Sequence, residues 1–256
     1  MNKIVCYPVL ALMLCQCGDN LNDMKEESDL ESDGCYPLVK ERYEYPISVP
    51  ATGKTMADVI REMQVPETIL ETMSTYSLIQ SILDNPLLKF SLVLSTSSVV
   101  GGAHVSFEQM NCIKELERRQ DCANIILFYK KIDYSCICAR IQESGSIEIP
   151  VRLYFFELLF TKREIADRLN PSEKRNLVSE LLHKYNQKLD YPDIVSDHLK
   201  VSSFMAMAWI MHADNYAPIM NLYKKDDVFR ESMNEDSFSP KHRNQILSYA
   251  ESFIKE

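Results

Sequence analysis

The hydrophobic positions beyond residue 54 recur at helical spacing over most of the chain. Apolar residues three and four positions apart lie on one face of a helix. Two such sets are Cys122, Ile125, Ile126 and Tyr129, and Leu177, Leu181, Leu182 and Tyr185. Residues 204–211 are apolar nearly all round, which predicts the most buried helix of the C-terminal half.

Capping residues and prolines divide this pattern into separate helices. Ser, Thr and Asn side chains can accept hydrogen bonds from first-turn N–H groups, and proline favours the first helical position. The predicted helices are 55–63, 66–73, 76–83, 107–118, 121–131, one starting at Asn170-Pro171, 204–211 and one starting at Ser239-Pro240. Glu173 adds the second half of a capping box to the helix that starts at Asn170.

Residues 134–151 break the helical pattern. Ile137, Ala139 and Ile141 alternate with polar residues, which predicts a small hairpin or an irregular connector. The chain has only 6 glycines, and sheet proteins depend on glycine at their turns. We therefore expect an all-α fold, a bundle or short superhelix of antiparallel helix pairs, with at most a small hairpin near residues 134–150.

The N-terminal segment has the layout of a secretory signal peptide, assigned to residues 1–16. Lys3 precedes an apolar run over residues 4–14, which is too short to span a bilayer. The run ends in Leu14-Cys15-Gln16-Cys17-Gly18, which fits a bacterial lipobox with the lipid on Cys17, or alternatively on Cys15. Acyl chains on this cysteine would hold the protein at a membrane.

An acidic segment follows the predicted lipid-attachment cysteine. Residues 18–35 carry seven acidic side chains and one lysine, so residues 17–35 are expected to form a disordered tether. This acidic stretch resembles the signal with which Bacteroidetes lipoproteins reach the outer leaflet of the outer membrane. The rest, residues 36–256, is predicted to be one helical domain, or two packed halves with a break near residues 133–150.

The charge of the chain argues against a nucleic-acid partner. The net charge is −9, of which −6 lies in residues 18–35. Lys3 contributes +1, so residues 36–256 carry −4. Nucleic-acid binding requires a basic surface, and the Arg118-Arg119 and Lys130-Lys131 pairs alone do not supply one.

The first helical block resembles a known group of proteins. The resemblance covers residues 65–131. It is carried by Val65-Pro66-Glu67-Thr68-Ile69-Leu70, Met73-Ser74-Thr75-Tyr76-Ser77-Leu78-Ile79, Leu83-Asp84-Asn85-Pro86-Leu87-Leu88, and Glu115-Leu116-Glu117-Arg118-Arg119 with Ala123 and Tyr129. These segments resemble uncharacterised secreted helical proteins and lipoproteins of Bacteroidetes and related gut bacteria. Two departures from the pattern are Asn85, where an aromatic residue is usual, and Met110-Asn111-Cys112, where Phe-Asn-Gly is usual. The resemblance implies fold and location and names no catalytic residue.

No catalytic motif is evident, and no cofactor or metal is predicted. His183, His198, His212 and Asp214 could converge as metal ligands, but histidines spread over different helices are more often capping or exposed residues. The aromatic cluster Tyr154, Phe155, Phe156 and Phe160 could line a groove, although core packing is the commoner role.

Five cysteines remain after the predicted signal and lipid site: Cys35, Cys112, Cys122, Cys136 and Cys138. An odd number leaves at least one thiol free. Two bridges are possible, and Cys112 with Cys122 is one candidate pair. In an anaerobic host all five could instead remain buried thiols.

These observations predict an envelope lipoprotein, exported and lipid-anchored to the outer membrane, that faces the periplasm or the cell surface. The first function class is a non-enzymatic component that binds a protein, a ligand or a glycan. The alternative is an exported hydrolase whose site is assembled from dispersed residues such as His198, His212 and Asp214.

Overall fold

The computed structural model describes residues 30–32, 35, 37–39, 41–46, 55–88, 99–144, 148–195, 197–235 and 237–256. The predicted signal peptide, the candidate lipid sites Cys15 and Cys17, and most of the predicted tether lie outside these residues. Within them the fold is all-α, as predicted, and a single two-stranded hairpin accompanies the helices.

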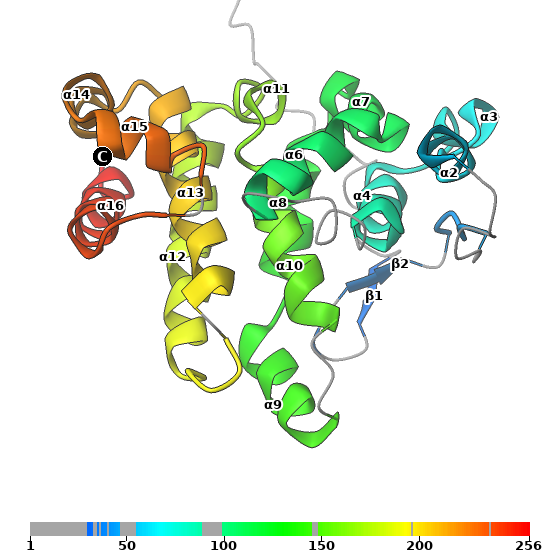
Figure 1. Ribbon diagram of the computed structural model, residues 1–256, viewed down its shortest axis with the longest axis horizontal. Helices are drawn as coiled ribbons and strands as arrows, with labels where there is room; N and C mark the ends of the chain where they lie inside the picture. Colours follow the sequence, from blue (N-terminus) through cyan, green and yellow to red (C-terminus); the bar gives the residue numbers. More distant parts are fainter. Residues whose placement is uncertain are drawn as a thin grey trace, which may run out of the picture.

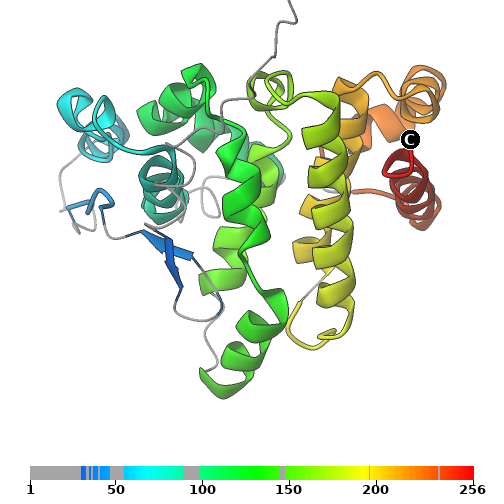
Figure 2. The same cartoon turned by 180° about the vertical axis from the view of Figure 1, so that it is seen from behind.

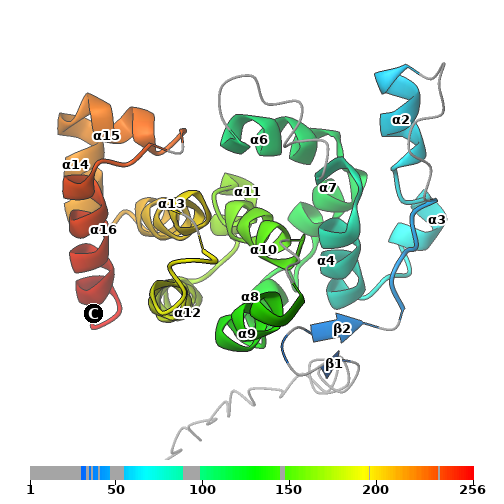
Figure 3. The same ribbon diagram turned by 60° about the horizontal axis from the view of Figure 1, so that its bottom comes forward.

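The N-terminal and the C-terminal helices lie at opposite ends of the molecule, with the middle of the chain between them (Figures 1 and 3). The N-terminal part contains α2 (Met56–Glu62), α3 (Glu67–Leu70), α4 (Thr75–Asp84), α6 (Val99–Gln109), α7 (Asn111–Arg118) and α8 (Asn124–Lys130). The middle contains α9 (Tyr134–Ser144), α10 (Glu148–Leu159), α11 (Arg163–Ala166), α12 (Pro171–Leu189) and α13 (Asp197–Ala213). The C-terminal end contains α14 (Ala217–Lys225), α15 (Asp227–Ser232) and α16 (Pro240–Phe253).

The predicted helix starts are confirmed where a capping side chain marks them. Thr55 and Asn170 each form a capping box, with Asp58 and Glu173 respectively. The Ser74 and Ser239 hydroxyls accept hydrogen bonds from backbone N–H groups in the first turns of α4 and α16. The helix predicted for 107–118 is interrupted at Met110, which separates α6 from α7.

The prediction for residues 134–150 was wrong, because most of this segment is helical. It contains α9 and the start of α10. Ile137 and Ile141, which suggested strand alternation, are four residues apart and both buried in α9, while Ala139 between them is exposed. Tyr134, Ile137, Cys138 and Ile141 are all buried, and their spacing of three and four residues places them on one face of a helix.

The described hairpin lies near the N-terminus instead. Strands β1 (Leu30–Ser32) and β2 (Pro37–Val39) pair antiparallel with Leu30 opposite Val39. β1 falls in the segment predicted as a disordered tether, so residues 30–32 are part of the folded body. Val39 is buried and β2 packs against α4.

One hydrophobic core connects the helices along the molecule. Its buried residues extend from Cys35 to Phe253. α10 packs against both α4 and α13, while α9 packs against α12 (Figure 2). α9 and the start of α10 lie in the range 133–150, where a break between two halves was predicted. Among the described residues, none of the helices has both the length and the apolar character that a membrane crossing requires.

Candidate functional site

A group of ionisable and hydroxyl side chains lies in the core, around an ion pair between α10 and α12. Lys188 Nζ lies 2.8 Å from Glu157 Oε1 and 2.7 Å from Oε2. The exposed fraction of the side chain is 1% for Lys188 and 0% for Glu157. Charges this deep are tolerated only when they are paired and hydrogen-bonded.

Four hydroxyl groups complete the environment of the Glu157 carboxylate. Tyr129 and Tyr134 donate to Oε1 at 2.6 and 3.3 Å. Ser202 and Ser203, from α13, donate to Oε2 at 2.5 and 2.9 Å. The carboxylate therefore receives hydrogen bonds from side chains of three helices, α8, α9 and α13, in addition to the ammonium group of Lys188 on α12.

The remaining donors of Lys188 are also used. Its ammonium group donates to the backbone oxygen of Leu199 at 3.2 Å and to Ser203 Oγ at 2.9 Å. Burial lowers the pKa of Lys188, and the neighbouring Glu157 carboxylate opposes that shift. Burial also raises the pKa of Tyr129, and the negative charge of Glu157 adds to this effect. The network thus holds a charged pair together with neutral tyrosines.

A second buried lysine on α12 lies one turn away. Lys184 Nζ donates to the backbone oxygen of Ile132 at 2.6 Å and lies 3.4 Å from that of Lys130. It also lies 5.1 Å from the centre of the Tyr129 ring. Burial lowers the pKa of Lys184 to about 8. These contacts satisfy carbonyl groups at the C-terminal end of α8, where a cation is favoured by the helix dipole.

A small cavity borders this network. It is lined by Tyr134, Ile137, Cys138, Lys188, Val195 and Leu199. It offers about 10 Å³ to the centre of a water molecule, which is room for about one water. Burial raises the pKa of the Cys138 thiol, and the nearby Lys188 charge opposes this. The cavity is far smaller than the sites that bind organic ligands.

The network joins helices and does not present a reactive group to solvent. Its charges are enclosed, and each has internal partners. We therefore assign Glu157 and Lys188 to stabilising the packing of α8, α9, α10, α12 and α13.

The structure does not assemble the residues that sequence suggested as metal ligands. His183 is exposed on α12, and His198 lies in α13 with its side chain outside the described part. The His212 ring lies between the rings of Trp209 and Tyr223, with centroid distances of 5.6 and 4.7 Å. Burial lowers the pKa of His212.

Asp214 is engaged elsewhere, since one of its carboxylate oxygens lies 3.5 Å from Lys174 Nζ. Within the described ranges no group of three or more His, Cys, Asp or Glu side chains could hold a metal ion. The residues suggested for an enzymatic site therefore have separate structural surroundings where they are described.

The aromatic cluster after residue 150 belongs to the core. Tyr154, Phe155, Phe156 and Phe160 are all buried, with Phe156 packed edge-on against Phe128 and Tyr129. The sequence favoured this role over a binding groove. Glu157 lies inside the same apolar run, and it was not among the candidate residues predicted from the sequence. The signal that could have identified it is one acidic residue flanked by two aromatic and two aliphatic residues.

Residues of the first helical block, within 65–131, connect helices of the N-terminal part. Arg119 donates to the backbone oxygen of Leu70 at 2.9 Å and to Thr75 Oγ1 at 3.3 Å. Thr75 in turn donates to Asp121 at 2.6 Å. These residues therefore join the end of α3, the start of α4 and the loop after α7, which is a structural role.

The two departures from the pattern are also accommodated by backbone contacts. Asn85 is buried, and its amide donates to the backbone oxygen of Met63 at 3.1 Å. The Asn111 amide donates to the Val65 oxygen at 2.6 Å, and its side-chain oxygen accepts from the Val65 N–H at 3.1 Å. Both asparagines thus fix the connection between α2 and α3.

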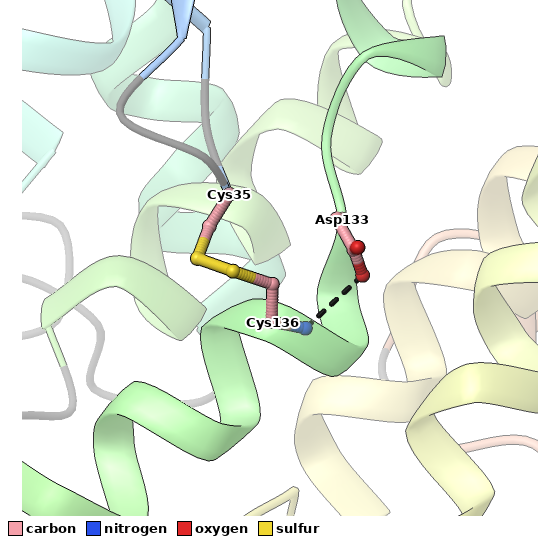
Figure 4. Close-up of a disulfide and its surroundings, with 3 residues drawn as sticks. All are labelled: Cys35, Asp133 and Cys136. Atoms are coloured by element: carbon pink, nitrogen blue, oxygen red, sulfur yellow. Dashed lines mark hydrogen bonds between the residues drawn. A yellow bond between two sulfur atoms is a disulfide. The ribbon is translucent and has the colours of Figure 1, made fainter.

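One disulfide joins the N-terminal hairpin to the helical body. Figure 4 shows Cys35, next to the hairpin, bonded to Cys136 in α9. The Cα atoms are 5.2 Å apart, which is within the usual range for a disulfide. Asp133 supports the junction, because its N–H donates to the Cys35 oxygen at 2.8 Å and its side chain accepts from the Cys136 N–H at 3.0 Å.

The other three described cysteines are buried thiols: Cys112, Cys122 and Cys138. The suggested Cys112–Cys122 bridge is therefore not formed. Burial raises the pKa of both of these thiols to about 11. At neutral pH they are protonated and behave as small apolar side chains.

No family model, no curated protein and no solved structure matches this chain. A functional assignment therefore rests on the sequence and on the structural features described above.

Proposed function

We propose that this protein is an exported lipoprotein, anchored through Cys17 to the outer membrane, whose helical body binds a protein or ligand partner and has no catalytic role. The export signal and the acidic segment after Cys17 motivate the location. The body that follows begins with the β1–β2 hairpin, which has Cys35 between its strands, and continues as an array of helices.

The observation that carries the proposal is the Cys35–Cys136 disulfide. Disulfides form and persist in oxidising compartments outside the cytosol and are rare within it. A bond between the start of the body and a helix 101 residues later supports folding after export. It also fixes the body at the point where the N-terminal segment would lead to the membrane.

The buried network supports a non-enzymatic role. The strongest concentration of perturbed ionisable groups, around Glu157 and Lys188, is enclosed in the core with its hydrogen bonds satisfied. Perturbed groups at a reaction site need access to a substrate. This network instead explains how five helices are held together.

Lipid labelling in bacterial cells tests the anchor. Cells expressing the protein are grown with an alkyne analogue of palmitate, and label on the purified chain is measured. We expect the wild type and the matched Cys15→Ser variant to be labelled and Cys17→Ser to be unlabelled. Absence of label from the wild type would contradict the lipoprotein assignment, whereas loss only in Cys15→Ser would move the attachment to that residue.

Affinity capture after light crosslinking, with protease treatment of intact cells in parallel, tests the binding role. We expect one envelope component in stoichiometric amount. Recovery of none, together with a hydrolytic activity that depends on His212 or Asp214, would replace binding with the enzymatic alternative.

A further inference from the structure

The native disulfide joins distant cysteines and leaves nearer ones unpaired. Cys35 and Cys136 are 101 residues apart, with Cys112 and Cys122 between them in the chain. Those two thiols are separated by only ten residues, yet both are free in the folded protein. The connectivity is therefore the reverse of what proximity along the chain favours.

Loop-closure entropy gives the size of that preference in the unfolded chain. The probability that two residues of a flexible chain meet falls with about the 3/2 power of their separation. A ten-residue loop therefore closes about 30-fold more often than a 101-residue loop. Before folding, oxidation should therefore produce the Cys112–Cys122 bond ahead of the Cys35–Cys136 bond.

Folding removes this competition. Cys112 lies in α7 and Cys122 lies just before α8, and both are fully buried. α9 places Cys136 next to Cys35 (Figure 4). Cys138 lines the small cavity that also borders Lys188. Because the buried thiols have a pKa of about 11, few thiolates are present to attack the native bond at neutral pH.

We propose that the chain reaches its Cys35–Cys136 bond by thiol–disulfide exchange from non-native bonds, and is therefore a substrate of a disulfide isomerase, an enzyme with a reactive cysteine thiolate. This inference rests on the export step of the proposed function, since it requires an oxidising compartment.

The first bond requires a two-electron oxidant, whereas the exchange steps that follow involve no net change of oxidation state. In the initial oxidation, two protein thiols lose two protons and two electrons to a disulfide oxidant, which becomes two thiols. The isomerase thiolate then opens the Cys112–Cys122 bond, forming a mixed disulfide with Cys112 and releasing the Cys122 thiolate.

Two further exchanges complete the route. The Cys35 thiolate attacks the Cys112 sulfur of the mixed disulfide and releases the enzyme thiolate. The Cys136 thiolate then attacks the Cys35 sulfur and releases Cys112. Cys35 and Cys136 have lost their protons, and Cys112 and Cys122 take up the same number.

Oxidative refolding of the full-length chain tests the proposal. The three N-terminal cysteines are replaced in every sample by the substitutions Cys6→Ser, Cys15→Ser and Cys17→Ser. The reduced, denatured chain is diluted into a mixture of reduced and oxidised glutathione, with or without protein disulfide isomerase as the probe. Samples are alkylated at intervals, and their bonds are mapped by peptide mass spectrometry.

We expect the Cys112–Cys122 bond to exceed the native bond by about 30-fold among the earliest one-disulfide molecules. The isomerase should raise the rate at which Cys35–Cys136 appears by tenfold or more. A native bond that forms first, or one that appears at the same rate with and without the enzyme, overturns the proposal.

Matched variants connect the effect to the competing thiols. In Cys112→Ala/Cys122→Ala, acceleration by the isomerase should fall below twofold. Cys138→Ala also removes a buried thiol but leaves the short loop, so it should keep the tenfold effect. Circular dichroism checks that each variant folds, and if the double variant does not, the wild-type time course decides the question.

The outcome is separable from that of the lipid-labelling experiment. Loss of the lipid assignment would leave the refolding result unchanged, because all refolded chains lack Cys17. An absent isomerase effect would overturn this inference and leave the anchor in place.

Discussion

At the scale of single residues, the Glu157–Lys188 pair is stabilising only as long as both charges are present. Each is completely enclosed, and the Glu157 carboxylate also accepts four hydroxyl hydrogen bonds. Removing one partner would leave an uncompensated charge in the core, which is far more costly than removing both.

Lys188→Met is therefore expected to lower the free energy of unfolding by about 3–5 kcal/mol, measured by urea denaturation. Glu157→Met/Lys188→Met should be more stable than Lys188→Met alone, because no unpaired charge remains. The exposed Lys225→Met serves as the control and should change stability by about 0.5 kcal/mol or less. Additive losses in the double variant would contradict the account of a paired charge.

Lys184 gives the protein a defined pH dependence. Its folded pKa of about 8 is below the ordinary value of 10.5, so between these values the unfolded chain binds more protons. The free energy of unfolding should therefore rise with pH in this window. Relative to Lys184→Met, the wild type should gain about 2 kcal/mol between pH 7 and pH 10. Parallel stability curves for the two proteins would show that the folded and unfolded pKa values are equal.

At the scale of secondary-structure elements, local residues determine where α12 begins, and tertiary contacts determine which of its polar residues are buried. Its start is determined by Asn170 and Glu173, which satisfy each other's backbone N–H groups. Its buried face carries Leu177 and Leu181, as predicted, and also Lys184 and Lys188. The lysines are placed inside because α8, α10 and α13 supply their acceptors.

Asn170→Ala should destabilise the protein by about 1 kcal/mol, because it removes the side-chain acceptor of the capping box. The measurement is the midpoint of thermal or urea unfolding. Asn176→Ala makes the same substitution at an exposed position within α12, and it should be neutral or slightly stabilising. Equal losses in the two variants would mean that the cap contributes nothing particular to this helix.

At the scale of the whole molecule, the disulfide connects the segment between β1 and β2 to α9 (Figure 4). It closes a loop of 101 residues that contains α2 to α8, so it restricts about two fifths of the 256-residue chain in the unfolded state. Ion pairs also link the N-terminal segment to the helices. Asp84, in α4, pairs with Arg42 at 3.1 Å and with Arg152, in α10, at 2.5 Å.

Cys35→Ala/Cys136→Ala should therefore lower the free energy of unfolding by about 2–5 kcal/mol, the range expected for a loop of this length. Unfolding of the wild type in the presence of a reductant should show a loss of similar size. Cys138→Ala is the control for removing a cysteine, and its free energy of unfolding should not fall by this amount. Wild-type stability that is unchanged by reduction would contradict this role of the bond.

The sequence alone determined the helical class and the starts of several helices. Thr55, Ser74, Asn170 and Ser239 cap their helices through backbone groups three residues away, so no distant contact is needed. The hydrophobic spacing likewise identified the buried faces of the helices. Both signals are local, which is why they could be interpreted without the fold.

The tertiary structure decided the features that depend on distant residues. Glu157 and Lys188 are 31 residues apart, and neither signals the other in the sequence. Residues 134–144 form a helix because Ile137 and Ile141 are buried on one side of it, although the alternation alone suggested a strand. The choice of Cys136 over Cys112 as the partner of Cys35 also follows from the folded arrangement of helices, since chain proximity favours the opposite outcome.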